Sequence, residues 1–224
     1  MNPVKPSWKT DWLPIVLIGI SIGVGSYLQV YLPNLVPSHW GFNGEVDGYS
    51  SRTFGAWFVP ALMIGIYLLF LALPYFDPKK EHYANFVEAY HGLKNLMVTF
   101  FFVTYILISA TGLGFDIPVG SLMPVGIGLL FIGIGYFIKS VKQNWAIGVR
   151  TPWTMESPTV WKRTNELMAR LMLLGGVLLT LCAFPIEDIY KATLLIITIV
   201  VIAVVPIVYS YFIYRAEQKG KKKK

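Results

Sequence analysis

Six long apolar runs constrain the fold of this chain more than any other feature of its sequence. They cover residues 12–32, 54–74, 94–113, 118–139, 166–185 and 190–214. The hydrocarbon core of a bilayer is about 30 Å thick, so a helix needs about 20 mostly apolar residues to cross it. A helix also satisfies its backbone polar groups internally, as hydrocarbon requires. The sequence therefore predicts an all-α polytopic membrane protein with six transmembrane helices.

The segments between these runs are too short to form a separate soluble domain. The longest of them covers residues 140–165, whereas a self-sufficient core needs more than about 40 residues. The single cysteine, Cys182, lies inside an apolar run and indicates neither a disulfide framework nor a metal motif. Function is therefore expected in the bundle or in its loops.

The basic residues predict the orientation of the chain. If the N-terminus is cytoplasmic, all 19 Lys and Arg residues except Arg52 and Lys191 fall on the cytoplasmic side. Cytoplasmic loops carry such an excess of Lys and Arg, so both termini are expected in the cytoplasm. This distribution accounts for the formal charge of +7. Because the basic residues are spread over several loops and a tail, no direct nucleic-acid partner is predicted.

The predicted spans carry no ionisable residue deep inside them. The stretches from Asp11 to Glu45, Lys94 to Asp116 and Lys191 to Arg215 all follow this rule. Proton relays and ion-coupled carriers usually place charged groups near the membrane midplane. The pattern therefore counts against an ion-coupled transporter.

Small residues in the first and fourth runs predict close helix packing. Gly19 and Gly23 form a small-xxx-small pair, and glycines recur in the fourth run at positions 126, 128, 133 and 135. Such spacing lets helix backbones approach closely. Packing within one chain is favoured over a dimer interface.

The outer loop, residues 33–53, contains the motif PSHWGFNGEVDGYSSR. Asn43-Gly44 and Asp47-Gly48 are turn dipeptides, so a structured extracellular loop is predicted. One interpretation is a metal or acid/base site, although one His and two carboxylates here have no fixed ligand spacing. A second is that the carboxylates only satisfy the turns, and a third is recognition of a peptide or lipid headgroup. The residues concerned are His39, Trp40, Glu45, Asp47 and Tyr49. No metal or cofactor is predicted.

Two dipeptides in which proline follows Asp or Ser predict helix starts on the cytoplasmic side. Ser157-Pro158 is typical of an N-cap followed by proline and predicts the start of the fifth helix. Asp77-Pro78 likewise predicts a helix that runs continuously into the third span. Such a helix would place Glu88, His91 and Asn95 on one stripe, facing the next cytoplasmic loop.

That loop holds the second motif, NWAIGVRTPWTMESPTVWKRTN, from Asn144 to Asn165. Its first part, to Met155, is expected to be non-helical, with a tight turn at Gly148 and extended geometry at Thr151 before proline. Arg150 offers a planar fork of donors that suits a carboxylate or a lipid phosphate. The candidate binding residues are Asn144, Gly148, Arg150, Thr151, Pro152, Trp153, Trp161 and Asn165, with Glu88, His91 and Asn95 in support. The alternative is that the tryptophans only anchor the interface, and both interpretations stay open.

These two motifs resemble a known family. The outer motif resembles a short domain of unknown function that often precedes SdpI-type modules, and the inner motif is similar to the signature of the SdpI immunity family. The resemblance implies an N-terminal two-helix domain over 1–80. It also implies an SdpI-like four-helix region over 81–224, with a signature loop at 140–165 and a basic C-terminal tail.

The resemblance also implies a function and a location. Members of the family are multi-pass proteins of the bacterial cytoplasmic membrane. The named member gives immunity to a secreted antimicrobial peptide toxin and signals by drawing a transcriptional repressor to the membrane. The expected partners are therefore membrane lipids, a peptide toxin on the outer face and a cytoplasmic repressor.

Two other functions remain open from the sequence. A lipid or peptide transporter or flippase is favoured by a division into three plus three spans. A membrane enzyme would have to use the cluster of His39, Glu45 and Asp47, because HExxH, GxSxG and CxxC motifs are absent. We therefore predict that the chain is not an enzyme.

Overall fold

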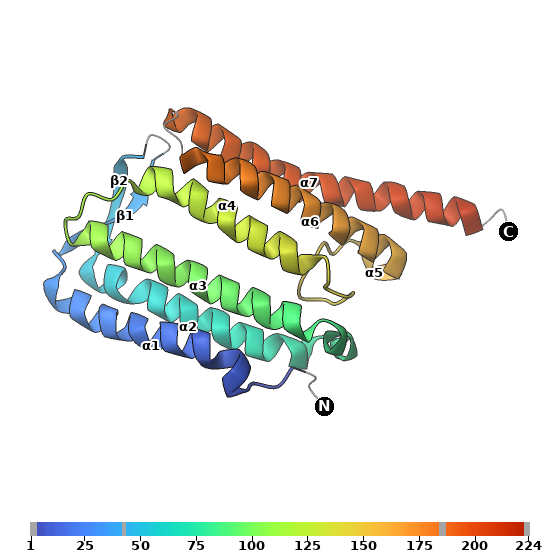
Figure 1. The fold of residues 1–224 in the computed structure, drawn as a ribbon, viewed down its shortest axis with the longest axis horizontal. Helices are drawn as coiled ribbons and strands as arrows, with labels where there is room; N and C mark the ends of the chain where they lie inside the picture. The colour runs from blue at the N-terminus through green and yellow to red at the C-terminus, as the bar shows by residue number, and fades with distance from the viewer. Residues whose placement is uncertain (1–3, 42–43, 184–186, 222–224) are drawn as a thin grey trace.

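The computed structural model describes residues 4–41, 44–183 and 187–221. Its long helices lie side by side as a bundle (Figure 1). They are α1 (Trp8–Tyr31), α2 (Arg52–Phe76), α3 (Val87–Gly112), α4 (Val119–Ile138), α6 (Pro158–Thr180) and α7 (Asp188–Lys221). The shorter elements are β1 (Leu35–Trp40), β2 (Val46–Ser51), the 3-10 helices η1 (Lys80–Asn85) and η2 (Leu181–Ala183), and α5 (Pro152–Glu156).

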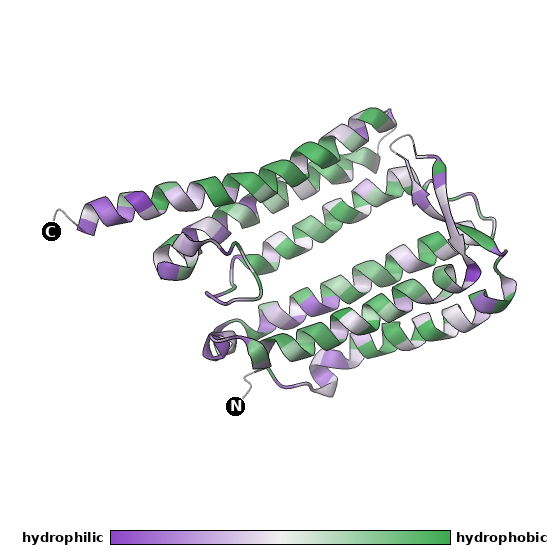
Figure 2. Cartoon of the chain, turned by 180° about the vertical axis from the view of Figure 1, so that it is seen from behind, coloured by the Kyte–Doolittle hydropathy of each residue, from purple (hydrophilic) through white to green (hydrophobic). Residues whose placement is uncertain are grey.

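Among the described residues, five helices are long and apolar enough to cross a membrane: α1, α2, α3, α4 and Ile189–Lys221 of α7. The chain is thus a mostly helical, polytopic membrane protein. The predicted span at 166–185 corresponds to α6, which begins earlier and contacts both α4 and α7. Four charged residues lower its hydropathy: Lys162, Arg163, Glu166 and Arg170. Hydrophobic residues cover the middle of the bundle, whereas the C-terminal part of α7 is hydrophilic (Figure 2).

The two predicted helix starts have different outcomes. Ser157 caps α6 as expected, because its Oγ accepts a hydrogen bond from the Val160 amide at 3.3 Å. The helix predicted from Pro78 is wrong, since the chain forms η1 there and α3 begins only at Val87. The Asp77 carboxylate accepts hydrogen bonds from Tyr83 and from a distant loop, which folds this segment back instead of extending it.

The outer loop is a β-hairpin, so the all-α prediction is wrong there. β1 pairs antiparallel with β2, from Leu35 opposite Ser51 to Trp40 opposite Val46, with irregularities around His39. Val36 on β1 is buried and belongs to a core cluster with residues of α1, α2 and α3, which fixes the hairpin on the bundle. The predicted turn residue Asn43 lies outside the described residues, as do Phe42 and the last lysines, 222–224.

Glycine packing is confirmed in α4 and not in α1. A Cβ on Gly128 would lie 2.7 Å from the carbonyl oxygen of Gly176, so α4 and α6 approach at backbone distance. In α1, a Cβ on Gly19 or Gly23 would meet no described atom within 4 Å, and it is Gly25 that contacts the backbone of α2. The predicted pair in α1 therefore does not mediate packing in this fold.

Candidate functional site

The signature loop, residues 140–165, lies at the end of the bundle that also holds η1 and the two termini (Figure 1). The β-hairpin lies at the opposite end. The loop leaves α4, passes through the short helix α5 and continues into the first turns of α6. Its predicted binding residues fall into those that hold the loop together and those that face its surroundings.

Asn144 holds the first turn of the loop and is fully buried. Its Nδ2 donates to the carbonyl oxygens of Lys142 and Ile147 at 2.7 and 2.9 Å. Its Oδ1 accepts hydrogen bonds from the amides of Ala146 and Ile147, both at 2.7 Å. The side-chain amide thus uses both donor hydrogens and both acceptor positions within the loop itself.

The buried side chains of Asn165 and Trp161 pack against the half-buried Gly148 and form a second unit. The Asn165 Oδ1 accepts from the Val149 amide at 3.0 Å, and its Nδ2 donates to the Trp161 carbonyl at 3.0 Å. The Trp161 indole donates to the Val141 carbonyl, also at 3.0 Å. Gly148 has a φ of 120° and lies against both side chains, which confirms the tight turn predicted there.

Thr151 is the N-cap of the short helix α5. The prediction that the loop is non-helical up to Met155 is therefore wrong from Pro152 onwards. The Thr151 Oγ1 accepts from the Thr154 amide at 3.2 Å, and the Thr154 Oγ1 accepts from the Thr151 amide at 2.8 Å. Pro152 occupies the first helical position, where its missing N–H costs nothing. Thr151 itself is extended, as predicted. Its Oγ1 also lies 3.1 Å from the Ser210 Oγ, which joins the loop to α7.

Arg150 and Trp153 are not part of the buried hydrogen-bond units of the loop. Arg150 is exposed, and its Nη1 donates a hydrogen bond to the Trp145 carbonyl. Trp153 is half-buried, with its ring centroid 5.1 Å from that of Tyr211 on α7. Both side chains therefore have surface that a partner or lipid could contact, as does the exposed Pro152.

Asp77 links the segment around η1 to the signature loop, a role that the sequence did not predict. It is buried, and its Oδ2 accepts hydrogen bonds from the Tyr83 hydroxyl and the Trp145 amide, both at 2.8 Å. Burial raises the pKa of the Tyr83 hydroxyl, and the neighbouring Asp77 carboxylate raises it further. The signal in the sequence was Asp77 before proline, which was interpreted as a helix cap.

Gln143 was missed as well, although it directly precedes the motif. Its Nε2 donates to the carbonyls of Thr154 and Met155 at 2.6 and 2.8 Å, while its Oε1 accepts from the Lys79 ammonium. Its own carbonyl lies 2.5 Å from the His82 Nδ1. The segment around η1 and the signature loop therefore form one hydrogen-bonded platform.

The three supporting residues do not gather at this loop. Glu88 is exposed and lines a cavity with Tyr136 and Lys139. His91 is buried and points to the α1 side, and Asn95 is half-buried with an Oδ1 that has no hydrogen-bond partner among the described residues. The stripe predicted from their spacing exists on α3, but its members have different surroundings.

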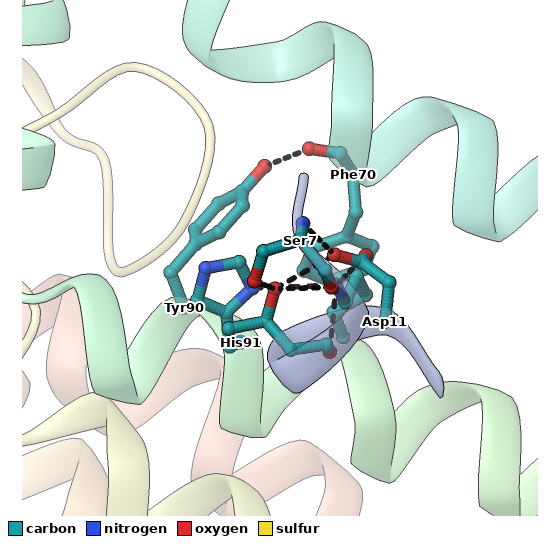
Figure 3. A network of polar contacts seen from close by, with 7 residues as sticks. Ser7, Asp11, Phe70, Tyr90 and His91 are labelled. Atoms are coloured by element: carbon teal, nitrogen blue, oxygen red, sulfur yellow. Dashed lines mark hydrogen bonds and ion pairs between the residues drawn. The ribbon is translucent and has the colours of Figure 1, made fainter. Parts of the chain in front are cut away.

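His91 lies beside a buried ion pair between Asp11 on α1 and Lys94 on α3. The Lys94 ammonium donates to the Asp11 carboxylate, with 1% and 3% of these side chains exposed, and it lies 3.3 Å from the His91 Nδ1. Asp11, His91 and Tyr90 lie together where α1, α2 and α3 meet (Figure 3). The bundle interior thus holds a charge pair near the end that also carries the signature loop.

In the outer hairpin, His39 and Asp47 face each other across the strands. The His39 Nδ1 lies 2.5 Å from the Asp47 Oδ1, and the two side chains are 73% and 52% exposed. No group of three His, Cys, Asp or Glu side chains that could hold a metal ion occurs in the described part of the chain. Tyr49 is exposed, while Trp40 is half-buried and lines a cavity near Lys191.

Comparisons with known proteins identify both halves of this arrangement. Residues 140–210 match the SdpI/YfhL protein family, and residues 16–64 match a domain of unknown function, DUF1648. Immunity protein SdpI of Bacillus subtilis (strain 168) is 24% identical over 207 residues, which cover 92% of this chain and 97% of that protein. No solved structure matches the chain. The resemblance predicted from the two motifs is confirmed: this multi-pass membrane protein is similar to the SdpI/YfhL family over residues 140–210 and to DUF1648 over residues 16–64.

Proposed function

We propose that this chain is an immunity protein that protects a bacterium from a secreted antimicrobial peptide toxin. The observation that carries this proposal is the similarity to Immunity protein SdpI, which extends over 92% of this chain and 97% of that protein. Similarity of that extent includes the hairpin, the signature loop and the helices between them. It therefore supports a shared function more strongly than a match to one loop would.

The proposed topology has six spans in the bacterial cytoplasmic membrane and both termini in the cytoplasm. α6 is added as the fifth span in chain order to the five helices already identified, because it has 23 residues and contacts both α4 and α7. A helix of that length extends about 34 Å, enough to cross the hydrocarbon core. The near absence of basic residues around the hairpin supports an outer position for it. The chain then divides into the two-helix region 1–80 and the four-helix region 81–224.

The two ends of the bundle have different tasks in this proposal. The hairpin presents the exposed side chains of His39, Asp47 and Tyr49 to the toxin or to the lipid that the toxin attacks. An acidic and aromatic surface suits a cationic or amphipathic peptide. The signature loop presents Arg150 and Trp153 on the cytoplasmic side, where they contact a transcriptional repressor. No catalytic step is part of this function.

A survival assay tests the immunity function. A toxin-sensitive bacterial host that expresses the chain is expected to survive exposure to the cognate member of a panel of secreted peptide toxins better than a host without it. Tyr49→Ala is expected to reduce survival, whereas Leu68→Ala, at an exposed apolar position of α2, is not. Membrane levels of each variant are measured by immunoblot. Equal killing with and without the chain over the whole panel would contradict the proposal.

The signalling part needs its own readout. Arg150→Ala and Trp153→Ala are expected to leave membrane insertion unchanged but to reduce recruitment of a fluorescent repressor to the membrane after toxin exposure. Asn144 and Asn165 hold the loop together through internal hydrogen bonds. Thermal unfolding of each variant is therefore measured in parallel, so that loss of recruitment through a destabilised loop is separated from loss of a direct contact. If repressor recruitment is the same in both loop variants as in the wild type, the cytoplasmic role of this surface is refuted while immunity can still stand.

A further inference from the structure

A groove of about 440 Å³ opens beside the signature loop, between α4, α6 and α7. Its apolar wall consists of Phe131, Met168, Ile199, Ile202, Ala203 and Ile207. Its other end is formed by the loop segment from Gly148 to Arg150. The groove therefore has a long apolar part and one strongly basic side chain at one end.

The depth of Arg150 in the membrane follows from its neighbours. The adjacent Thr151 lies 3.1 Å from Ser210 through their hydroxyl oxygens, so Arg150 is near the level of Ser210 on α7. The apolar part of α7 begins at Ile189. A hydrocarbon core of about 30 Å takes about 20 helical residues, which places its other boundary close to Ser210. Arg150 therefore lies where lipid phosphates are found.

The apolar wall runs from that level towards the middle of the membrane. On α7 it extends from Ile207 to Ile199, which corresponds to about 12 Å at 1.5 Å per residue. Ile199 and Ile207 are about half exposed, so the groove is open to the hydrocarbon region. Its length and direction match those of a lipid acyl chain.

The guanidinium of Arg150 suits a phosphate group. Its Nη1 donates one hydrogen bond to the Trp145 carbonyl, and Arg150 forms no ion pair with a carboxylate in the described ranges. A planar guanidinium binds phosphate oxygens through parallel N–H donors. A cationic choline or ethanolamine headgroup would be repelled by this same side chain, so a lipid with a net negative charge is favoured.

We propose that this groove binds an anionic phospholipid, with its phosphate on Arg150 and one acyl chain between α4, α6 and α7. The proposal does not depend on toxin immunity, because lipid binding is measured directly on the purified protein, although Arg150 also belongs to the surface proposed to contact a repressor. It also gives Arg150 a ligand class that neither the family match nor the relative assigns.

Native mass spectrometry of the full-length, delipidated protein tests this site. Phosphatidylglycerol, phosphatidylcholine and soluble glycerol 3-phosphate are added separately at equal concentrations. One phosphatidylglycerol per chain is expected to bind at least about fivefold more tightly than phosphatidylcholine, as a charge-assisted contact predicts. Glycerol 3-phosphate is expected neither to bind nor to compete, because it lacks the acyl chain. Competition by glycerol 3-phosphate at the same concentration would identify a free-phosphate site and overturn the lipid proposal.

Matched variants separate the two halves of the groove. Arg150→Gln is expected to weaken phosphatidylglycerol binding at least about fivefold, whereas Arg215→Gln, an exposed arginine elsewhere on α7, is not. Ala203→Trp fills the apolar part and is expected to weaken binding of both lipids, unlike Val204→Trp on the neighbouring surface. Arg150→Lys keeps the positive charge but loses the planar guanidinium, and it is expected to weaken phosphatidylglycerol binding. It therefore tests the site even if Arg150→Gln does not fold. Unchanged phosphatidylglycerol affinity in Arg150→Lys and Arg150→Gln, or in Ala203→Trp, would refute the proposal.

Discussion

At the scale of single residues, Gly148 combines a positive φ with close packing against two buried side chains. Its φ is 120°, and a Cβ there would lie 2.8 Å from the Asn165 Oδ1 and 2.9 Å from the Trp161 ring. Strain of this kind costs about 1–3 kcal/mol, and the Asn165 side chain would also have to move. Gly148→Ala is therefore expected to lower the thermal unfolding temperature in detergent. Gly65→Ala is the control, because it adds a methyl group in open space on a helix and is expected to be neutral or stabilising.

Tyr83 gives a second prediction at this scale, on alkaline stability. Burial and the Asp77 carboxylate raise the pKa of Tyr83 in the folded chain above its ordinary value of about 10. The unfolded chain therefore loses this proton first as pH rises, so the stabilisation is fully present below pH ~10 and declines above it. Tyr83→Phe removes this contribution, up to about 1.4 kcal/mol per pH unit. Its thermal stability is expected to fall less steeply above pH ~10 than that of the wild type, and an equal slope would refute the assignment.

The sequence drew attention to two amides of the signature loop but did not predict the contacts that they make. Asn144 and Asn165 stood out because anchoring at an interface does not require amides, and the structure places both in internal hydrogen bonds of the loop. The role of Asp77 could not be predicted in the same way. Its partner Trp145 is 68 residues away, and such long-range hydrogen bonds leave no local pattern in a sequence.

At the scale of helices, the Asp11 and Lys94 ion pair joins α1 to α3 inside the bundle. Removing one partner leaves the other charge buried without compensation, which costs about 3–5 kcal/mol. Replacing both partners by neutral side chains removes that penalty. Lys94→Met is therefore expected to destabilise the chain more than the double variant Asp11→Asn with Lys94→Met, as measured by thermal unfolding in detergent. If the single and double variants unfold at the same temperature, the pair does not stabilise this contact.

Elements were predictable where the signal was local. Ser157 and Pro158 lie next to each other and contain the whole start signal of α6. The hairpin was predicted only as a structured loop, because cross-strand pairs such as Leu35 with Ser51 depend on contacts between separate segments. The predicted continuous helix from Pro78 failed for the same reason, since the hydrogen bonds of Asp77 come from other parts of the chain.

At the scale of the whole molecule, the proposed topology depends on whether α6 crosses the membrane. If it does, the segment before α7 lies outside with the hairpin, whereas α5 and the end of α7 lie in the cytoplasm. The exposed positions Tyr49, Glu156, Glu187 and Lys219 sample these four regions. The native Cys182 is 1% exposed and can be replaced by alanine to give a background without cysteine.

Single cysteines at these positions are tested in intact cells with a membrane-impermeant thiol reagent. Tyr49→Cys and Glu187→Cys are expected to react, because both face the outside in the six-span arrangement. Glu156→Cys and Lys219→Cys are expected to react only after the membrane is permeabilised, which also shows that their thiols are accessible. Labelling of Tyr49→Cys with protection of Glu187→Cys would mean that α6 does not cross, because Glu187 would then share the side of Glu156. Labelling of Glu156→Cys instead of Tyr49→Cys would show that the chain has the opposite orientation in the membrane. The hairpin, with its exposed His39 and Asp47, would then lie in the cytoplasm, where no secreted peptide could meet it.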